Sequence, residues 1–192
     1  MQLVLGSRNA HKLRELRALV APEGLELLPD EVELPPETGE SFAENAQVKA
    51  RATAEATGRP ALGEDSGITV RALAGAPGIR SARYAGPGAG DKENLEKLLK
   101  ETEGLDDRSA AYVCALAFAD PNGEQRIFEA RCEGQLAREP NGTAGFGYDP
   151  IFIPDDEDGE FTMASLPPER KNAISHRGKA ARLFLDWLAS RR

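Results

Sequence analysis

Residues 109–137 read SAAYVCALAFADPNGEQRIFEARCEGQLA, and this stretch decides the fold class. Two long runs typical of β-strands, Ser109–Ala119 and Gln125–Ala137, flank the segment Pro121-Asn122-Gly123. An Asn-Gly pair between two such runs is a strong hairpin signal, because both residues tolerate the positive φ angles that tight hairpin turns need. The sequence therefore predicts a long antiparallel hairpin.

Strands and helices are predicted before this hairpin as well. Residues 2–6 form a short apolar run typical of a buried strand. Ser41-Phe42-Ala43-Glu44 is a capping box that opens an alanine-rich helix running to about Thr57. Ala61-Leu62-Gly63 predicts a short strand that ends before a polar segment. This mixture predicts an α/β fold with a mixed sheet, in one domain or in two lobes around a cleft.

The composition limits the classes of partner. Twenty-four basic against 32 acidic residues give a net charge of −8, whereas proteins that grip polymeric nucleic acid normally carry a basic excess. No stretch approaches the roughly 18 consecutive apolar residues of a membrane span. The N-terminus reads as a first strand rather than a leader. We therefore expect a cytoplasmic protein that binds neither nucleic acid nor membrane.

The cysteine and histidine content bears on metal chemistry. Two cysteines and two histidines disfavour a Cys/His zinc site, so a metal should bind carboxylates and be Mg²⁺ or Mn²⁺. We expect Cys114 and Cys132 to be reduced thiols that face the core, because cytosolic proteins rarely keep disulfides.

A polar loop at residues 7–11 follows the first predicted strand and precedes a helix predicted from about Lys12 to Val20. Backbone N–H groups at the start of a helix favour anions, and Asn9 and Lys12 add a side-chain donor and a cation. The loop matches neither of the glycine-rich phosphate-binding motifs. It is therefore either an anion site or an ordinary polar connection.

Two stretches supply candidate carboxylates. Glu64-Asp65-Ser66-Gly67 follows the strand predicted at residues 61–63, where adjacent carboxylates can hold a divalent cation beside a phosphate or take a proton from water. Glu37 lies in a turn flanked by proline and glycine, which can aim one more carboxylate. The alternative is a turn in which Asp65 caps the segment that follows.

Asn45 and Lys49 are four residues apart on the helix predicted over residues 41–57. They therefore project from the same face of that helix, where the pair can meet phosphate oxygens and a carboxylate. The alternative is a solvated helix face.

Two further stretches offer contacts for a base. Thr143–Pro150 places two glycines around Phe146, which frees the backbone for close approach of a ligand and leaves a ring for stacking. Lys171–Gly178 gathers four potential donors at a helix start, namely Lys171, Ser175, His176 and Arg177. The alternatives are an aromatic-anchored loop and a structural histidine.

Taken together, these stretches resemble the inosine triphosphate pyrophosphatase family, also called Ham1-like proteins. The resemblance runs nearly end to end through ordered, specific motifs. They are Ser7–Lys12, Ser41–Ala46 with Lys49, Glu64–Gly67, Gly75–Gly78 with Ser81–Tyr84, Gly145–Pro150 and Ala173–Gly178.

The resemblance implies a fold and an activity. The fold would be an elongated mixed central β-sheet flanked by helices, with two lobes around a substrate cleft, and the protein would be a homodimer. The activity would be Mg²⁺-dependent hydrolysis of the α–β bond of deaminated purine triphosphates such as ITP, dITP and XTP, which yields the monophosphate and pyrophosphate. We expect one such pyrophosphatase domain over residues 1–192.

The same resemblance implies roles for particular residues. Asp65 would be the proton acceptor and would bind the metal together with Glu37 and Glu64. The triphosphate would contact Ser7, Asn9, Lys12, Lys49 and Ser66. The sugar and base would contact Phe146, Gly147, Tyr148, Asp149, Lys171, His176 and Arg177. As a permanent donor, Arg177 would attract a 6-keto oxygen and disfavour the amino group of adenine.

Two positions depart from the pattern of many bacterial members, and two other functions stay open. Glu64 stands where many have aspartate, and Arg8 where many have glycine. A Maf-like nucleotide pyrophosphatase of other specificity is the nearest enzymatic alternative, although its early Ser-Pro-Arg-Arg motif is absent. A non-catalytic nucleotide-binding protein is the other alternative. Glu37 and Asp65 argue against it, since a sensor needs no proton acceptor.

Overall fold

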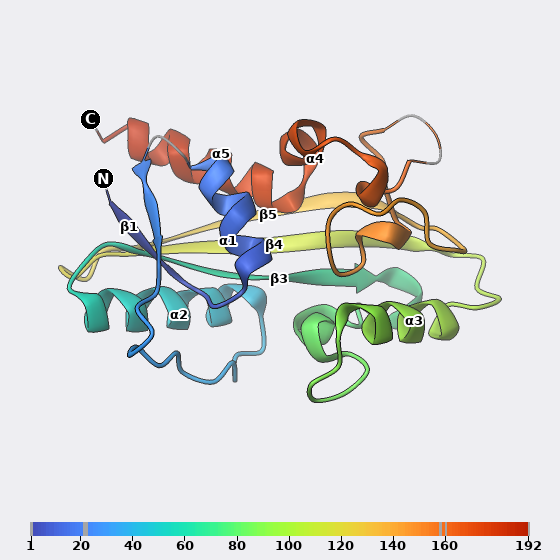
Figure 1. Ribbon diagram of the computed structural model, residues 1–192, viewed down its shortest axis with the longest axis horizontal. Coiled ribbons are helices and arrows are strands. Elements are labelled where there is room, and N and C mark those ends of the chain that lie inside the picture. Colours follow the sequence, from blue (N-terminus) through green and yellow to red (C-terminus); the bar gives the residue numbers. More distant parts are fainter. Residues whose placement is uncertain (1, 21–22, 158, 160, 192) are drawn as a thin grey trace. The chain divides into compact units, whose positions relative to one another are not determined.

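The computed structural model describes residues 2–20, 23–157, 159 and 161–191 (Figure 1). Its strands are β1 (Leu3–Gly6), β2 (Leu25–Leu27), β3 (Ala61–Val70), β4 (Ser109–Ala119), β5 (Gln125–Leu136) and β6 (Phe152–Pro154). They form one six-stranded sheet in the order β2-β1-β3-β4-β5-β6. β1 is parallel to β2 and β3, whereas β5 and β6 are antiparallel. The predicted α/β fold with a mixed sheet is confirmed.

The described residues include five α-helices and four short 3₁₀-helices. The α-helices are α1 (Ala10–Leu19), α2 (Phe42–Thr57), α3 (Asp91–Glu101), α4 (Pro168–Ile174) and α5 (His176–Ala189). The 3₁₀-helices are η2 (Arg71–Leu73), η3 (Gly78–Arg83), η4 (Asp149–Ile151) and η5 (Met163–Ser165). Within the described part of the chain, no helix has the length and apolar character needed to cross a bilayer.

The fold divides into two compact units. Unit 1 consists of Met1–Asp65, Cys114–Ala130 and His176–Arg192, and unit 2 consists of Ser66–Val113 and Arg131–Ser175. The chain passes between the units within β3, β4 and β5 and between α4 and α5. Unit 1 has two apolar clusters and unit 2 has one among the described residues.

Unit 1 buries apolar side chains on both faces of its part of the sheet. On one face, Leu16 of α1 and Phe184 of α5 pack with strand residues such as Leu62. On the other face, the alanines of α2 pack against alternate alanines of β4. This division follows from the two-residue repeat of a strand, which sends successive side chains to opposite faces.

The packing of α2 against the sheet is unusually close, and glycine permits it. A Cβ at Gly63 would lie 2.1 Å from the carbonyl oxygen of Ala46, and one at Gly6 would lie 2.5 Å from Thr53 Oγ1. The backbone of α2 therefore lies directly on β3. As a result, the polar side chains on its inner face reach the strand.

Unit 2 has a core of aliphatic and aromatic residues. Ile68 and Val70 of β3 pack there with Tyr112 of β4 and Phe152 of β6, and the two rings meet edge to face with centroids 4.7 Å apart. Both cysteines are buried free thiols, as predicted: Cys114 lies in the core of unit 1 and Cys132 in that of unit 2.

The prediction of a short strand over residues 61–63 was wrong in length. β3 continues for ten residues, so Glu64–Gly67 lie inside the strand rather than in a turn after it. Leu62, Ile68 and Val70 share one face of this strand with Glu64, a pattern of period two that the polar residues interrupt. Three consecutive polar residues, 64–66, indicate a turn when only the sequence is considered. The oppositely charged side chains that let Glu64 and Asp65 be buried within a strand come from other elements.

Two helix boundaries also differ from the predictions. α1 begins at Ala10 rather than Lys12, because Asn9 is its N-cap and accepts hydrogen bonds from the backbone N–H groups of His11 and Lys12. Residues 171–178 do not form one helix start. Lys171 belongs to α4, which opens with proline at its first position, and His176 begins α5.

Candidate active site

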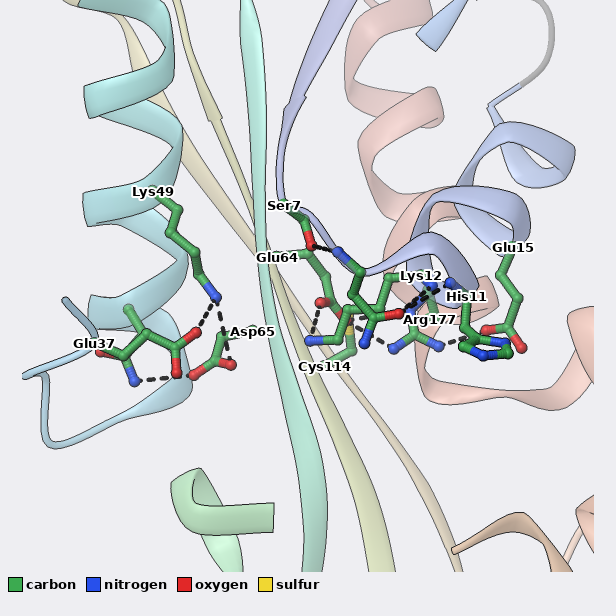
Figure 2. A network of polar contacts seen from close by, with 12 residues as sticks. Ser7, His11, Lys12, Glu15, Glu37, Lys49, Glu64, Asp65, Cys114 and Arg177 are labelled. Atoms are coloured by element: carbon green, nitrogen blue, oxygen red, sulfur yellow. Dashed lines mark hydrogen bonds and ion pairs between the residues drawn. The ribbon is translucent and has the colours of Figure 1, made fainter. Parts of the chain in front are cut away.

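Glu64 and Asp65 are consecutive residues of β3, and their side chains lie on opposite sides of the strand (Figure 2). Glu64 faces Lys12 and Arg177, whereas Asp65 faces Lys49. The predicted carboxylate pair therefore belongs to two separate polar clusters, both of them in unit 1.

The cluster around Asp65 combines side chains from a strand, a helix and a loop. Lys49 Nζ of α2 lies 2.7 Å from Glu37 Oε1 and 3.6 Å from Asp65 Oδ1. Asn45, one turn earlier in α2, donates from Nδ2 to Asp65 Oδ2 over 2.9 Å. Glu37 comes from the loop that precedes α2. The prediction that Asn45 and Lys49 share one face of a helix is confirmed.

The side-chain amide of Asn45 has a fixed orientation. The backbone N–H of Gly39 donates to Asn45 Oδ1 over 2.9 Å, so the amide nitrogen faces Asp65. A Cβ at Gly39 would lie 2.7 Å from that same oxygen, which makes glycine the residue that fits there. Asn45 is 2% exposed. Its hydrogen bonds with Gly39 and Asp65 link the loop that carries Glu37 to the Asp65 carboxylate.

Burial and neighbouring charges shift the pKa of Asp65 and the pKa of Lys49. Burial raises the pKa of Asp65 above the usual aspartate value, and the opposing effects of Lys49, Lys12 and the Asn45 hydrogen bond do not cancel it. Burial lowers the pKa of Lys49, but the charges of Asp65 and Glu37 outweigh burial and raise it. Lys49 is therefore charged at neutral pH, and Asp65 is a stronger base than an exposed aspartate.

Arg8 connects the loop that carries Glu37 to the start of α1. Its Nη2 donates to the backbone carbonyls of Asp30 and Val32 over 2.9 and 2.8 Å, and its Nη1 lies 3.4 Å from the Asp30 carboxylate. Hydrogen bonds from a charged donor to carbonyls fix backbone position. A glycine at position 8 would make none of these contacts.

The predicted phosphate contacts Ser7 and Asn9 shape the connection between β1 and α1. Ser7 Oγ accepts from the backbone N–H of Asn9 over 3.2 Å, and Asn9 Oδ1 caps α1. Ser7 is buried at the end of β1, whereas Asn9 is exposed. Ser66, the remaining predicted phosphate contact, is a half-buried residue of β3 and belongs to unit 2.

Glu64 is fully buried and bridges two cations (Figure 2). Its Oε2 lies 2.6 Å from Lys12 Nζ, and its Oε1 accepts from Arg177 Nη2 and Nε over 2.9 and 3.2 Å. The third nitrogen of the Arg177 guanidinium, Nη1, donates to Glu15 Oε2. Burial lowers the pKa of Arg177, but the charges of Glu64 and Glu15 outweigh it and raise that pKa. The Cys114 thiol lies 3.7 Å from Glu64 Oε1.

This second cluster bears on two of the predicted roles. The sequence predicts Glu64 as a metal ligand beside Asp65 and Glu37, but the structure places its carboxylate between two cations on the other side of β3. A fully buried carboxylate requires such compensation. Arg177, predicted to contact the base, is 2% exposed, and all three of its nitrogens contact carboxylates.

In unit 2, the predicted base contacts are organised around Asp149. Its carboxylate accepts from the Phe146 backbone N–H over 2.9 Å, from Lys171 Nζ over 2.7 Å and from the Tyr112 hydroxyl over 3.1 Å. The ammonium of Lys171 also lies 5.1 Å from the centroid of the Phe146 ring. Asp149 is 3% exposed, so its oxygens hold the Phe146 loop and Lys171 in place.

The other predicted base contacts occupy different positions. The Gly147 N–H donates to Asp91 at the start of α3 over 2.8 Å. Tyr148 points into the core of unit 2, where its hydroxyl donates to the Ser81 carbonyl, and burial raises its pKa. His176 is buried at the first position of α5, in unit 1. The structure thus gathers Phe146, Asp149 and Lys171 and directs Tyr148 inward.

The sequence as a whole matches a known family. A model of the Ham1 family matches residues 3–187 of this chain. The chain belongs to the Ham1 family. A relative from Cutibacterium acnes, named dITP/XTP pyrophosphatase, is 49% identical and covers 96% of this chain and 94% of its own length. A relative of the same name from Geobacillus kaustophilus is 46% identical over 97% of this chain and 94% of its own length.

Solved Ham1 structures share the fold. A HAM1 protein from Coxiella burnetii superposes with a TM-score of 0.87 and is 43% identical, with 99% of each chain covered. The Ham1 protein of Staphylococcus aureus gives a TM-score of 0.89 at 36% identity, with 100% of each chain covered. The likeness therefore extends over both units of this Ham1 chain.

The donor set of this Ham1 protein suits a magnesium ion at one of its two clusters. Asp65 and Glu37 both approach the Lys49 ammonium, so their oxygens already lie around one positive charge. Mg²⁺ is usually bound by one or two carboxylates together with substrate phosphates. Among the described residues, no group of three or more His, Cys, Asp or Glu side chains could hold a metal by itself. Glu37 and Asp65 thus fit a cation that a substrate helps to bind.

The structure adds one residue of this Ham1 protein, Glu15, to those that the sequence analysis singled out. Asn45, which the sequence places beside Lys49 with a carboxylate as a possible partner, contacts Asp65. Glu15 pairs with Arg177 across 162 positions, which no local pattern indicates. Glu15 and Arg177 meet because α1 and α5, which carry them, pack against each other.

Proposed function

We propose that this Ham1 protein hydrolyses deaminated purine nucleoside triphosphates, namely ITP, dITP and XTP, to the monophosphate and pyrophosphate. The observation that carries the proposal is the buried cluster in which Asn45 and Lys49 hold the Asp65 carboxylate beside Glu37. The names of relatives at 49% and 46% identity, dITP/XTP pyrophosphatase, support the substrate class.

Asp65 is the proton acceptor in this proposal. Its raised pKa makes it a better base than an exposed aspartate, and Asn45 fixes the direction of its carboxylate. Asp65 takes a proton from water as the water oxygen bonds to the α-phosphorus. The bond from the α-phosphorus to the α–β bridging oxygen breaks, and pyrophosphate leaves with that oxygen.

Glu37 and Asp65 would hold Mg²⁺, with Mn²⁺ as the alternative. When bound, the cation supplies charge neutralisation for the triphosphate and for the departing pyrophosphate. Lys49 lies 2.7 Å from Glu37 and contributes a second positive charge from the protein itself. Its ammonium therefore keeps the two carboxylates together before any ligand arrives.

The triphosphate would contact Lys49 together with Ser7, Asn9, Lys12 and Ser66. A few local cations meet this need, which agrees with a net charge of −8 for the whole chain. Phe146 and Lys171 are the predicted base contacts with the best support, since the Phe146 backbone N–H and the Lys171 ammonium both donate to Asp149. Gly147, Tyr148, Asp149, His176 and Arg177 stay predicted contacts.

A substrate panel tests the proposed function. Release of pyrophosphate from ITP, XTP, GTP, ATP and UTP should be fast for ITP and XTP and slower by roughly 10⁴-fold for ATP, because hydrogen-bond complementarity discriminates on that scale. A preference for UTP would favour the Maf-like alternative. Binding of ITP without hydrolysis of any nucleotide would favour the non-catalytic alternative.

We further propose that the protein acts as a homodimer in the cytoplasm. Light scattering should then give twice the 20.7 kDa mass of one chain. A mass of one chain at micromolar concentration would contradict the dimer.

A further inference from the structure

We propose that Glu64 is a positioning residue that holds Lys12 and Arg177 through its two carboxylate oxygens and does not bind the catalytic metal. The inference rests on the proposed function in one respect, namely that Lys12 contacts the phosphates. The sequence suggests that Glu64 is a metal ligand, because the next residue, Asp65, is one of the predicted metal ligands. We assign Glu64 a different role.

Geometry separates Glu64 from the metal cluster. It alternates with Asp65 along β3, so the two carboxylates leave the strand on opposite sides (Figure 2). Both oxygens of Glu64 are used: Oε2 lies 2.6 Å from Lys12, and Oε1 accepts two hydrogen bonds from Arg177. A metal would have to displace one of these cations.

Charge explains why Glu64 is needed. Lys12 and Arg177 carry two positive charges, and Glu64 and Glu15 carry two negative ones, so the four side chains form a neutral group. Glu64 is 0% exposed and Arg177 is 2% exposed, and an uncompensated charge at such depth costs several kcal/mol. Glu64 is the member of this group that contacts both cations.

Of the two cations in the cluster, Lys12 is the one that a ligand can reach, since the side chain of Arg177 is only 2% exposed. The Lys12 side chain is 15% exposed, whereas that of Glu64 is 0% exposed. Lys12 also follows the N-cap of α1, where backbone N–H groups favour anions. The buried Glu64 carboxylate therefore holds the Lys12 ammonium and limits the rotamers of the Lys12 side chain. As a result, Lys12 loses less conformational entropy when a phosphate binds.

The experiment separates metal binding from phosphate binding with Glu64→Gln, which keeps shape and removes charge. Mn²⁺ binding to the metal-free protein is followed by electron paramagnetic resonance, and binding of inorganic pyrophosphate is followed by calorimetry without metal. We expect unchanged Mn²⁺ affinity and about tenfold weaker pyrophosphate binding, the scale of one charge-assisted hydrogen bond. Glu37→Gln should weaken Mn²⁺ binding instead.

Two matched variants test the route of the effect. Glu15→Gln removes a carboxylate that contacts Arg177 and not Lys12, so pyrophosphate affinity should stay within twofold of the parent. In a Lys12→Met background, Glu64→Gln should cause no further loss of pyrophosphate affinity, because coupled residues are not additive. If Glu64→Gln fails to fold, Glu64→Asp, which withdraws the carboxylate by one methylene, is used in its place.

Three results would overturn the inference. A loss of Mn²⁺ affinity in Glu64→Gln equal to that in Glu37→Gln would make Glu64 a metal ligand. Unchanged pyrophosphate affinity with a lower Tm would make it a purely structural ion pair. Additive losses with Lys12→Met would show that it acts elsewhere. None of these readouts requires turnover of ITP, so failure of the proposed function would be recognised separately.

Discussion

The Asp65 carboxylate and the Asn45 side-chain amide are joined by a 2.9 Å hydrogen bond whose direction the rest of the cluster determines. Because Asn45 Oδ1 accepts the N–H of Gly39, the amide nitrogen is the group that faces Asp65. Asn45 therefore stabilises the ionised form of a carboxylate whose burial favours the protonated form.

Asn45→Ala should lower kcat by about tenfold, since it removes one hydrogen bond to a charged group. The acidic limb of the pH profile of kcat/KM should move to higher pH, because the lost hydrogen bond had lowered the pKa of Asp65. Rates with ITP at a series of pH values measure both effects. Arg51→Ala, on the exposed side of α2, is the control and should change neither. A lower kcat with an unmoved acidic limb would show that Asn45 does not act through Asp65.

Asp65→Asn should reduce kcat by at least about 10²-fold, because an amide cannot accept the proton from water. Retention of more than a tenth of the parent kcat would contradict the role of Asp65 as proton acceptor.

The metal-free Asp65→Asn variant should also melt at a higher temperature than the metal-free parent at neutral pH. A raised pKa in the folded state means that stability is lost as pH rises through that pKa, so the neutral amide avoids a cost that ionised Asp65 imposes. For a protein of this size, an increase of about 1 kcal/mol in the free energy of unfolding raises Tm by roughly 2–4 °C. Below the pKa of an unfolded aspartate the two proteins should melt alike.

Lys49→Met should weaken binding of triphosphates more than binding of IMP. Lys49 contacts both Glu37 and Asp65, and its loss leaves two neighbouring carboxylates without their shared cation. Affinity for inorganic pyrophosphate should fall by about tenfold or more, the scale of a charged hydrogen bond. Calorimetry with IMP and with pyrophosphate measures the difference. Equal losses for the two ligands would place Lys49 away from the phosphates.

Gly63→Ala should destabilise the protein by about 1–3 kcal/mol, the usual cost of overpacking. The new Cβ would lie 2.1 Å from the Ala46 carbonyl oxygen, which is backbone and cannot turn away. Gly90→Ala is the control, since its Cβ would meet a movable Glu93 side chain at 3.0 Å. Urea denaturation of both variants measures the free energy of unfolding. A Gly63→Ala protein as stable as the control would show that α2 can move off the sheet at little cost.

Arg8→Ala should raise the Mg²⁺ concentration needed for half-maximal activity by a few-fold and leave kcat at saturating Mg²⁺ unchanged. Arg8 anchors the backbone at Asp30 and Val32, a few residues before Glu37, so its loss should make the Glu37 position less defined. A loss of two hydrogen bonds at a half-exposed site is worth about 1 kcal/mol. Titration of activity with Mg²⁺ measures the effect. Arg14→Ala, which removes a contact to His11, is the control. An equal shift in both variants would show that Arg8 has no particular connection to Glu37.

Local signals were sufficient for several parts of this fold. The hairpin of β4 and β5 follows from Asn122-Gly123 between two strand-like runs, and α2 follows from its capping box, in which Ser41 Oγ accepts from the Glu44 N–H. The separate helix α4 was not predicted from the sequence, although proline suits the first position of a helix.

The sequence by itself determined which chemical groups the protein has and in which motifs they lie: carboxylates at Glu37, Glu64 and Asp65, cations at Lys12 and Lys49, and a nearly end-to-end resemblance to one family. Tertiary structure decided which of these groups meet. Because β3 continues through residues 64 and 65, their side chains diverge, and Asp65 joins Asn45, Lys49 and Glu37 while Glu64 joins Lys12 and Arg177. The physical reason is that buried charges are stable beside opposite charges, and those partners come from helices far away in the sequence.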